Sequence, residues 1–286
     1  MSGFEQAWRS WHAERERALA EPHGWLSITA RHWLTPEPQR FDGIPGTWRE
    51  DGDAAVVVVD PDEEFGVSGT TRFELVNSGP GEMVKAGDRV VEVARRSGYL
   101  LRLRDLAAPV RAAFRGVPAY EPDPAWVLPG RFEPYDEPRP VTVGAVVEGL
   151  SHVYFSPGVL RFAYRGEEFA LTAFNGKGGA AFSVLFTDAT SGVTTYAANR
   201  SLAVAGPDAD GRVELDFNRA VNLPCAFIDL ATCPLPPPEN RLPFPVEAGE
   251  QIPWERRQRA AAGCFADSLT PIRSCRRRSG SGAHQA

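Results

Sequence analysis

The residue types best suited to chemistry lie in one run, from Asp216 to Glu250. It combines carboxylates, amides and arginines with two cysteines and seven prolines. Because proline lacks a backbone donor and fixes φ, the run is expected to form an extended, ordered segment rather than a helix or a central strand. We call residues 216–250 the strap. A stiff segment can hold side chains in fixed positions, so the strap is the leading candidate for a functional site.

The two thiols of the strap are candidate nucleophiles. Cys225 follows a proline and lies close in sequence to Arg219 and Asn222. A nearby cation lowers the pKa of a thiol and favours the nucleophilic thiolate. The alternative is a buried cysteine that packs as a small apolar residue, which the absence of a histidine nearby in the sequence favours. Cys233 offers the same two interpretations, and a reducing compartment favours free thiols over a disulfide between them.

A second candidate group is polar and centred on Arg200. Apolar residues alternate with Asp216 and Asn218 where the strap begins, so a strand would place these two side chains on one face. A guanidinium beside a carboxylate and amides is suited to a small anionic or amide-bearing ligand. The alternative is a buried Arg200–Asp216 pair that only braces the sheet. The sequence leaves both interpretations open.

The strap and its surroundings resemble a family of bacterial and archaeal proteins, domain of unknown function 1684 (DUF1684). The resemblance extends weakly upstream and covers most of residues 20–250. The segments that carry it are 216–220, Asn222, 224–227, 233–234, 239–242 and 248–250, with 188–190, 195–196, Arg200 and, more weakly, 22–26, 101–105 and 123–126. It implies that Arg200, Asp216, Asn218 and Asn222 are recurring polar positions, and it implies no activity.

Composition excludes several functional classes. The chain has 286 residues, a formal net charge of −6 and a pI near 5.5, which argues against nucleic acid as a partner. No apolar stretch approaches the length of a membrane span, and the charged N-terminus lacks the apolar core of a signal peptide, so a cytoplasmic location is expected. The cysteine and histidine spacings do not form a zinc pattern, and the loop 175–179 lacks a phosphate-binding ending. We therefore expect no metal and no cofactor.

The chain as a whole is expected to be mainly β. Apolar residues at helical spacing predict an amphipathic helix up to Leu19, and a second short helix is predicted over 25–34. Short β-branched runs then predict an antiparallel β-sandwich or open barrel in which sheets have one buried and one wet face. The predicted strands are 54–59, 72–76, 89–94, 99–104, 141–147, 160–164, 169–174, 181–187, 193–196 and 213–217. The Pro-rich segment 133–140 is interpreted as a loop in preference to a domain linker.

Three parts of the chain are distinguished. Residues 1–38 are expected to form N-terminal helices that pack on the body, residues 39–250 a single β-rich domain, and residues 251–286 an extension that is partly disordered. The arginine run 276–278 lies in that extension.

These patterns together predict a cytoplasmic enzyme that acts on a small anionic or carbonyl-bearing metabolite in a pocket between the strap and Arg200. The catalytic candidates are Cys225, Asp216 and Arg200. The substrate-binding candidates are Asn218, Arg219, Asn222, Tyr196, Trp25 and Asn240. A small-molecule substrate is the expected partner, and a homodimer through a sheet edge is kept open. The alternative function is a non-catalytic module that binds a small molecule or a protein.

Overall fold

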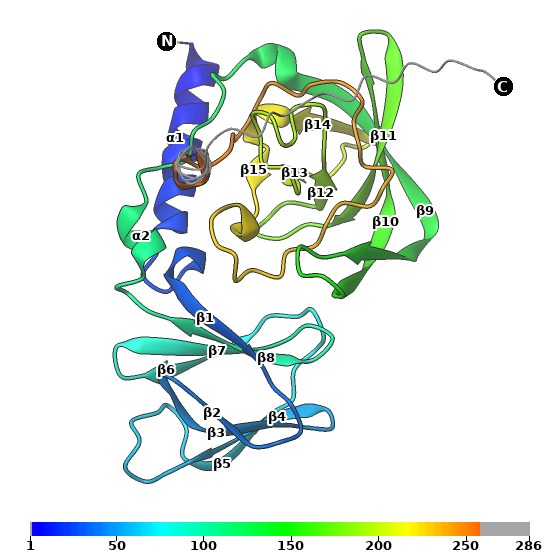
Figure 1. Cartoon of the computed structure of the whole chain (residues 1–286). Coiled ribbons are helices and arrows are strands. Elements are labelled where there is room, and N and C mark those ends of the chain that lie inside the picture. The colour runs from blue at the N-terminus through cyan, green and yellow to red at the C-terminus, as the bar shows by residue number, and fades with distance from the viewer. Residues whose placement is uncertain (1, 258–286) are drawn as a thin grey trace, which may run out of the picture.

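The protein is a mainly antiparallel β structure, as its strand pattern predicted (Figure 1). The computed structural model describes residues 2–257. Three antiparallel sheets account for most of the regular structure, and helices are few and mostly short. The helical elements are α1 (Gly3–Leu19), α2 (Pro109–Ala113), and the 3-10 turns η1 (Trp25–Ser27), η2 (Pro124–Trp126), η3 (Phe217–Arg219) and η4 (Pro224–Ala226).

Two four-stranded sheets formed by the first third of the chain share one core. Their orders are β1-β8-β7-β6 and β2-β3-β4-β5, and they stack below the larger sheet in Figure 1. Trp48 from one sheet and Tyr99 from the other are fully buried in the same apolar cluster. The strands are β1 (Ile28–Trp33), β2 (Gln39–Phe41), β3 (Ile44–Asp51), β4 (Ala54–Val59), β5 (Gly69–Phe73), β6 (Glu82–Ala86), β7 (Arg89–Arg95) and β8 (Tyr99–Arg104).

The rest of the chain builds a seven-stranded sheet of order β14-β9-β10-β11-β12-β13-β15. It curves around a second core, centred on aromatic and aliphatic residues such as Phe186, Leu160 and Phe217, until β13 lies against β14. The strands are β9 (Val127–Gly144), β10 (Ser151–Tyr164), β11 (Glu167–Asn175), β12 (Phe182–Phe186), β13 (Arg200–Val204), β14 (Arg212–Asp216) and β15 (Val221–Asn222).

The N-terminal helix packs against the strap. Ser2 caps α1 by accepting a hydrogen bond from the amide of Glu5, and Glu5 forms an i,i+4 ion pair with Arg9 at a separation of 2.9 Å. Trp8 is buried, and its indole Nε1 donates to the carbonyl of Asn218 at 2.8 Å. The apolar face of this helix therefore packs against the body of the protein, as the helical spacing of its apolar residues predicted.

The prediction of a helix over residues 25–34 is wrong. Only the 3-10 turn Trp25–Ser27 is helical, and the chain continues as strand β1. This strand pairs with β8, with Ala30 opposite Leu103. Its residues alone do not distinguish the two structures, and pairing with a buried neighbouring strand decided the outcome.

The prediction of a loop over residues 133–140 is also wrong, because this segment is part of one long strand, β9. Its prolines were the reason for the prediction, since proline cannot donate to a sheet. The register with β10 shifts between Ser156 and Gly158, where their partners on β9 are Arg139 and Pro134. The neighbour on the other side, β14, pairs only with residues 127–131. An irregular, half-free strand edge tolerates the missing donors.

A third correction concerns residues 193–196, which were predicted to be a strand. The amides of Val193, Thr194 and Thr195 all donate to the carbonyl of Thr190, so this segment is a tight turn. Only an isolated bridge, between Ser191 and Thr195, remains of sheet pairing.

The strap crosses the lower edge of the large sheet and returns past it without forming regular helices beyond η4 (Figure 1). Isolated bridges tie it to the body at Pro234, Arg241 and Glu250. Among the residues that are described, no helix has the length and apolar composition needed to cross a membrane. The predicted disorder of the C-terminal extension concerns mainly residues outside those described, 258–286, which include Cys264, Cys275 and the arginine run. The proposed boundaries at residues 38 and 250 stay predictions.

Candidate functional site

Arg200 is buried inside the large sheet, and its two terminal nitrogens are used by the protein, whereas its Nε has no hydrogen-bond partner among the described residues. It begins β13, is 1% exposed, and its Nη2 lies 2.7 Å from a carboxylate oxygen of Asp188. The same nitrogen donates to the carbonyl of Val246 at 3.0 Å, and Nη1 donates to the carbonyl of Ala248. Burial lowers the pKa of this guanidinium, and the carboxylate of Asp188 opposes that effect. The alternative pairing of Arg200 with Asp216 is wrong.

Asp188 is the residue that the sequence analysis did not select. Its Oδ1 accepts hydrogen bonds from the amide and hydroxyl of Thr190 at 2.7 and 2.6 Å and from the amide of Val246 at 3.2 Å. The segment Asp188-Ala189-Thr190 carried a usable signal, because Asp two residues before Thr favours such a local turn. Together, Asp188 and Arg200 fasten the strap at Val246 to the end of β12.

Asp216, Asn218 and Arg219 form a separate group beside α1. The strand ends at Asp216, whose Oδ1 accepts from the amide and side chain of Asn218 at 3.1 and 2.9 Å. The side chain of Asn218 also exchanges two hydrogen bonds, both of 2.9 Å, with the backbone of Asp123. Arg219 is exposed, pairs with Asp216 at 3.1 Å and stacks over Trp11. The side chains of Asp216 and Asn218 therefore meet, but they hold a turn.

Asn222 lies opposite Arg200 in the β13–β15 ladder and next to a buried carboxylate. Its amide donates to Oε2 of Glu250 at 2.6 Å, and its side chain donates to the carbonyl of Gln251 at 2.8 Å. Arg15 of α1 reaches Oε1 of Glu250 at 3.2 Å. Burial raises the pKa of Glu250, although Arg15 and the Asn222 amide counteract part of that shift.

The side chain of Asn240 joins the strap to the large sheet by hydrogen bonds. Its Oδ1 accepts from the amide of Thr172 at 2.7 Å, and its Nδ2 donates to the carbonyls of Thr172 and Leu185 at 2.9 and 2.8 Å. The residue is fully buried. Both side-chain donors are thus committed to backbone groups, in the manner of a short extra strand.

Three other candidates meet at what we call the thiol junction, defined by Cys225, Cys233, Tyr196, Trp25 and Arg102. The first four belong to one apolar cluster. This cluster lies at the boundary between the large sheet and the two four-stranded sheets, which we call the sandwich. Cys225 and Cys233 are both buried free thiols, and the amide of Cys225 donates to Sγ of Cys233 at 3.4 Å. The structure thus joins the two cysteines that the sequence separates by eight positions.

The thiols of this pair differ in acidity. A hydrogen bond from Cys225 lowers the pKa of Cys233, and the Cys225 amide and nearby Arg102 act in the same direction against burial. The pKa of Cys225 is raised, because its own proton is held in that hydrogen bond and the site is buried. Burial also raises the pKa of Tyr196 to about 12, with the two thiols adding to the shift. The favoured thiolate is therefore that of Cys233.

A buried ionic cluster supports the junction from the sandwich side. Glu92 accepts from Arg102 at 2.9 Å and from Arg104 at 2.5 Å, and both guanidinium groups lie over the Trp25 ring, at 5.1 and 5.4 Å. Arg102 also donates to the Thr232 hydroxyl at 2.8 Å, next to Cys233. The sequence predicted a wet face for β8, but every residue of that strand is buried. This prediction is wrong, because that face meets the strap instead of water.

A histidine also lies beside the junction. His152 on β10 approaches the carbonyl of Thr232 with Nε2 at 3.0 Å and the Ser78 hydroxyl with Nδ1 at 3.2 Å. Burial lowers its pKa, which favours the neutral ring. No local signal could have linked it to Cys233, since 80 positions of sequence lie between it and Thr232. Within residues 2–257, no three His, Cys, Asp or Glu side chains group as metal ligands would.

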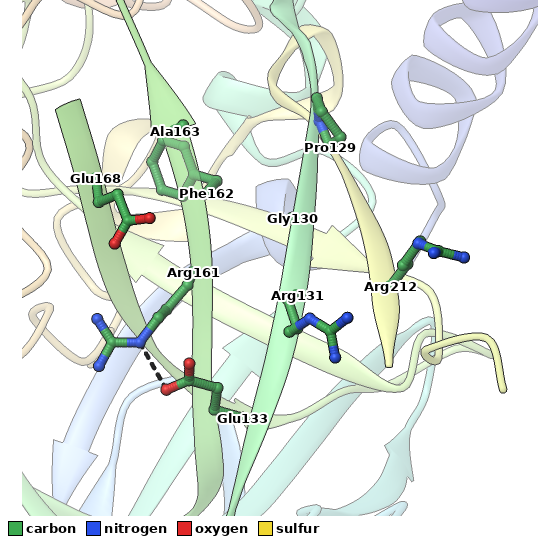
Figure 2. Close-up of a pocket in the computed structure, with 9 residues that line it drawn as sticks. All are labelled: Pro129, Gly130, Arg131, Glu133, Arg161, Phe162, Ala163, Glu168 and Arg212. Atoms are coloured by element: carbon green, nitrogen blue, oxygen red, sulfur yellow. Dashed lines mark hydrogen bonds and ion pairs between the residues drawn. The ribbon is translucent and has the colours of Figure 1, made fainter. Parts of the chain in front are cut away.

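Two cavities lie elsewhere on the surface. The larger, of about 590 Å³, is a groove on the outer face of the seven-stranded sheet (Figure 2). The smaller, of about 400 Å³, is lined by 28–29, 108–110 and the strap residues 227–230. Neither is lined by Arg200, Asp216, Asn222 or Cys225. The candidate residues thus lie in several separate places. These are the β13–β15 ladder at Arg200 and Asn222, the turn at Asn218, the hydrogen bonds of Asn240 to the large sheet, and the thiol junction.

Residues 112–251 match the model of a family described as a protein of unknown function, DUF1684. This segment belongs to the DUF1684 family. The match confirms the resemblance for the strap and the large sheet, whereas the upstream motifs at 22–26 and 101–105 lie outside it. The DUF1684 segment contains Arg200, Asp188 and both junction thiols, while Trp25 and Arg102 come from the sandwich.

The chain is also similar to an uncharacterized protein of Haloarcula marismortui whose structure was solved in solution by NMR. The two are 29% identical over 49% of this chain and 78% of that one, with a TM-score of 0.42. None of the curated proteins matches this chain. The comparisons therefore supply a family without an activity, and the function must be argued from the residues.

Proposed function

We propose that this protein is a cytoplasmic enzyme that acts on a small carbonyl-bearing metabolite through thiol chemistry at Cys233. The observation that carries the proposal is the hydrogen bond from the Cys225 amide to Sγ of Cys233, at 3.4 Å. A sulfur that accepts an amide and a second thiol, with Arg102 nearby, is the environment in which a thiolate forms most readily. This moves the nucleophile from Cys225, which the sequence favoured, to its partner.

The chemistry starts with attack by sulfur. Sγ of Cys233 forms a bond to the carbonyl carbon, and the π electron pair moves onto the oxygen. Tyr196 is suited to hydrogen-bond that oxygen, because its raised pKa of about 12 keeps the hydroxyl protonated at neutral pH. Cys225 holds the thiolate in place before attack. Trp25, between two guanidinium groups, supplies an aromatic wall that Arg102 and Arg104 fix in position.

The other candidates serve as positioning residues in this proposal. The ladder between Arg200 and Asn222 fixes the strap at Asn222, two positions before the η4 turn that carries Cys225. Asp216, Asn218 and Arg219 fix the preceding turn, and Asn240 fixes the returning half of the strap. They are expected to affect turnover through the placement of the thiols.

The test is the rate of alkylation of each thiol by iodoacetamide as a function of pH, read by mass spectrometry of the individual cysteine peptides. In the folded protein, Cys233 should react with a titration midpoint below that of an ordinary thiol near 8.5. The Cys225→Ala variant should raise that midpoint, because it removes the thiol that donates to Cys233. Cys233→Ser should leave Cys225 slow at every pH.

Two outcomes would reject the proposal. One is a Cys233 that stays unreactive in a protein whose circular dichroism is native. The other is a Cys233 titration that is unchanged by Cys225→Ala. In that case the second function, a non-catalytic module for small molecules, is favoured by the cavity of about 400 Å³ beside strap residues 227–230.

A further inference from the structure

The outer face of the large sheet carries three arginines in a row. Arg131 on β9 lies directly opposite Arg161 on β10 and directly opposite Arg212 on β14. Directly opposed residues of antiparallel strands point to the same face, so the three side chains emerge side by side. With strands about 4.8 Å apart, the row spans roughly 10 Å. We call this the arginine row.

The arginine row opens into the groove of about 590 Å³ shown in Figure 2. Small residues on the same strands, Gly130 and Ala163, line its floor. A Cβ at Gly130 would come within 2.5 Å of the core residue Leu215 and 2.7 Å of the Arg161 carbonyl, so this glycine is required by packing on the inner side of the sheet. The volume lies within the range of pockets that hold metabolite-sized ligands, about 300–1,000 Å³.

The central arginine is the one without a direct ion pair. Arg161 pairs with Glu133 at 2.6 Å, and Arg212 pairs with Asp210. Arg131 makes no ion pair within 4 Å among the residues that the structure describes. Like charges placed directly opposite one another destabilise a sheet. The row therefore has a central cation without a direct ion pair, although Asp208 acts on Arg131 and Glu168 acts on Arg161 electrostatically.

The flanking pairs are weak enough to be exchanged. Arg161 and Glu133 have side chains that are 48% and 46% exposed, and those of Arg212 and Asp210 are still more open to water. Exposed ion pairs contribute little to stability, because water screens them. A bound anion that accepted forked hydrogen bonds could replace these carboxylates without a large loss.

We propose that the arginine row binds the diphosphate group of a small molecule. Guanidinium groups bind phosphate oxygens in pairs, and three arginines on strands that together span roughly 10 Å match two linked phosphates better than a single compact anion. The groove beside the row provides space for the rest of the molecule. Arg131 holds the centre of the diphosphate, and Arg161 and Arg212 hold its two ends.

The test is calorimetric titration of the full chain with inorganic pyrophosphate at constant ionic strength. The native protein is expected to bind, and Arg131→Gln should raise the Kd by at least about tenfold because it removes a charge-assisted fork. Arg131→Lys should recover only part of the affinity, since an ammonium keeps the charge without the fork. Glu133→Gln should tighten binding, because Arg161 loses its competing carboxylate.

Arg139→Gln is the matched control. Arg139 lies on the same strand outside the groove, stacked over Tyr135 at 4.0 Å, and its loss changes the net charge by the same amount. It should change the Kd less than about twofold, since distant exposed charges are screened. An equal effect of Arg139→Gln and Arg131→Gln, or no binding at all, would overturn the proposal.

Titrations with phosphate and with citrate test the ligand class. Weaker binding of both than of pyrophosphate supports a diphosphate, whereas equal or tighter binding of citrate overturns that assignment. The arginine row and the thiol junction share no residue. Failure of this experiment therefore leaves the thiol proposal standing, and the converse also holds.

Discussion

Arg200 and Arg131 belong to the same seven-stranded sheet but have opposite surroundings. Arg200 is 1% exposed, pairs with Asp188 at 2.7 Å and donates to two strap carbonyls. Arg131 is exposed and unpaired among the described residues, and two other arginines stand beside it. The buried residue commits its two terminal nitrogens to the fold, whereas the exposed one leaves its donors accessible, as the proposed anion site requires. Residue type alone does not separate these roles.

The same contrast divides the strap. Asn240 and Asn218 have donors and acceptors that already bond the backbone of neighbouring segments. The thiol junction differs, because its two sulfurs interact with each other and their acidities diverge. Polar groups that are fully satisfied by the protein hold its shape, and groups left in an unequal pair are available for chemistry.

The largest expected effect is a loss of stability when the buried Arg200–Asp188 pair is broken. Asp188→Asn keeps the size of the side chain but leaves the Arg200 charge buried without its partner. Loss of one member of a buried pair costs about 3–5 kcal/mol. Urea denaturation should show this loss in the free energy of unfolding.

Glu133→Gln is the control for that experiment, because it removes a carboxylate from an exposed arginine pair. It should cost no more than about 1 kcal/mol. If the two variants lost equal stability, the distinction between buried and exposed arginines would fail.

An intermediate effect is expected at Glu250, and it depends on pH. Because burial raises its pKa, folded Glu250 keeps its proton to higher pH than it does in the unfolded chain. The native state then binds more protons, so this contribution to stability is complete below the unfolded pKa and is lost as pH rises through the folded pKa. The free energy of unfolding, measured relative to Glu250→Gln, should fall over that window.

Glu247→Gln removes an exposed carboxylate three positions earlier and controls for the loss of one charge. Unfolding of all three proteins by urea between pH 4 and pH 8 provides the measurement. A difference between native protein and Glu250→Gln that rises with pH would contradict the raised pKa.

The smallest expected effect on stability is that of replacing the exposed residue, Arg131. Arg131→Gln relieves repulsion within the arginine row and removes no ion pair. Its free energy of unfolding should lie within about 0.5 kcal/mol of the native value, and any gain should shrink in 1 M salt. A loss of several kcal/mol, seen in thermal or urea unfolding, would show that Arg131 supports the fold instead of facing a ligand.

Several elements could be predicted because their signals are local. The strand 54–59 has the predicted bounds, and the N-terminal helix ends at the predicted Leu19. Β-branched alternation and helical spacing are properties of a few neighbouring residues. The strand β1 was missed because its pairing partner, β8, lies some 70 positions away. The prolines of β9 were read correctly as poor donors, but the half-free edge that tolerates them is a property of the assembled sheet.

The candidate site shows the same division. The strap, its two thiols and the polar positions around Arg200 could be selected from residue type and order. The partner of Arg200, the contact between Cys225 and Cys233, and the opposition of three arginines on β14, β9 and β10 could not. Burial and charge proximity fix a group's pKa and its free donors, and both arise only when distant segments pack together. The order of residues chose which groups are present, and the fold determined which of them remain free to act.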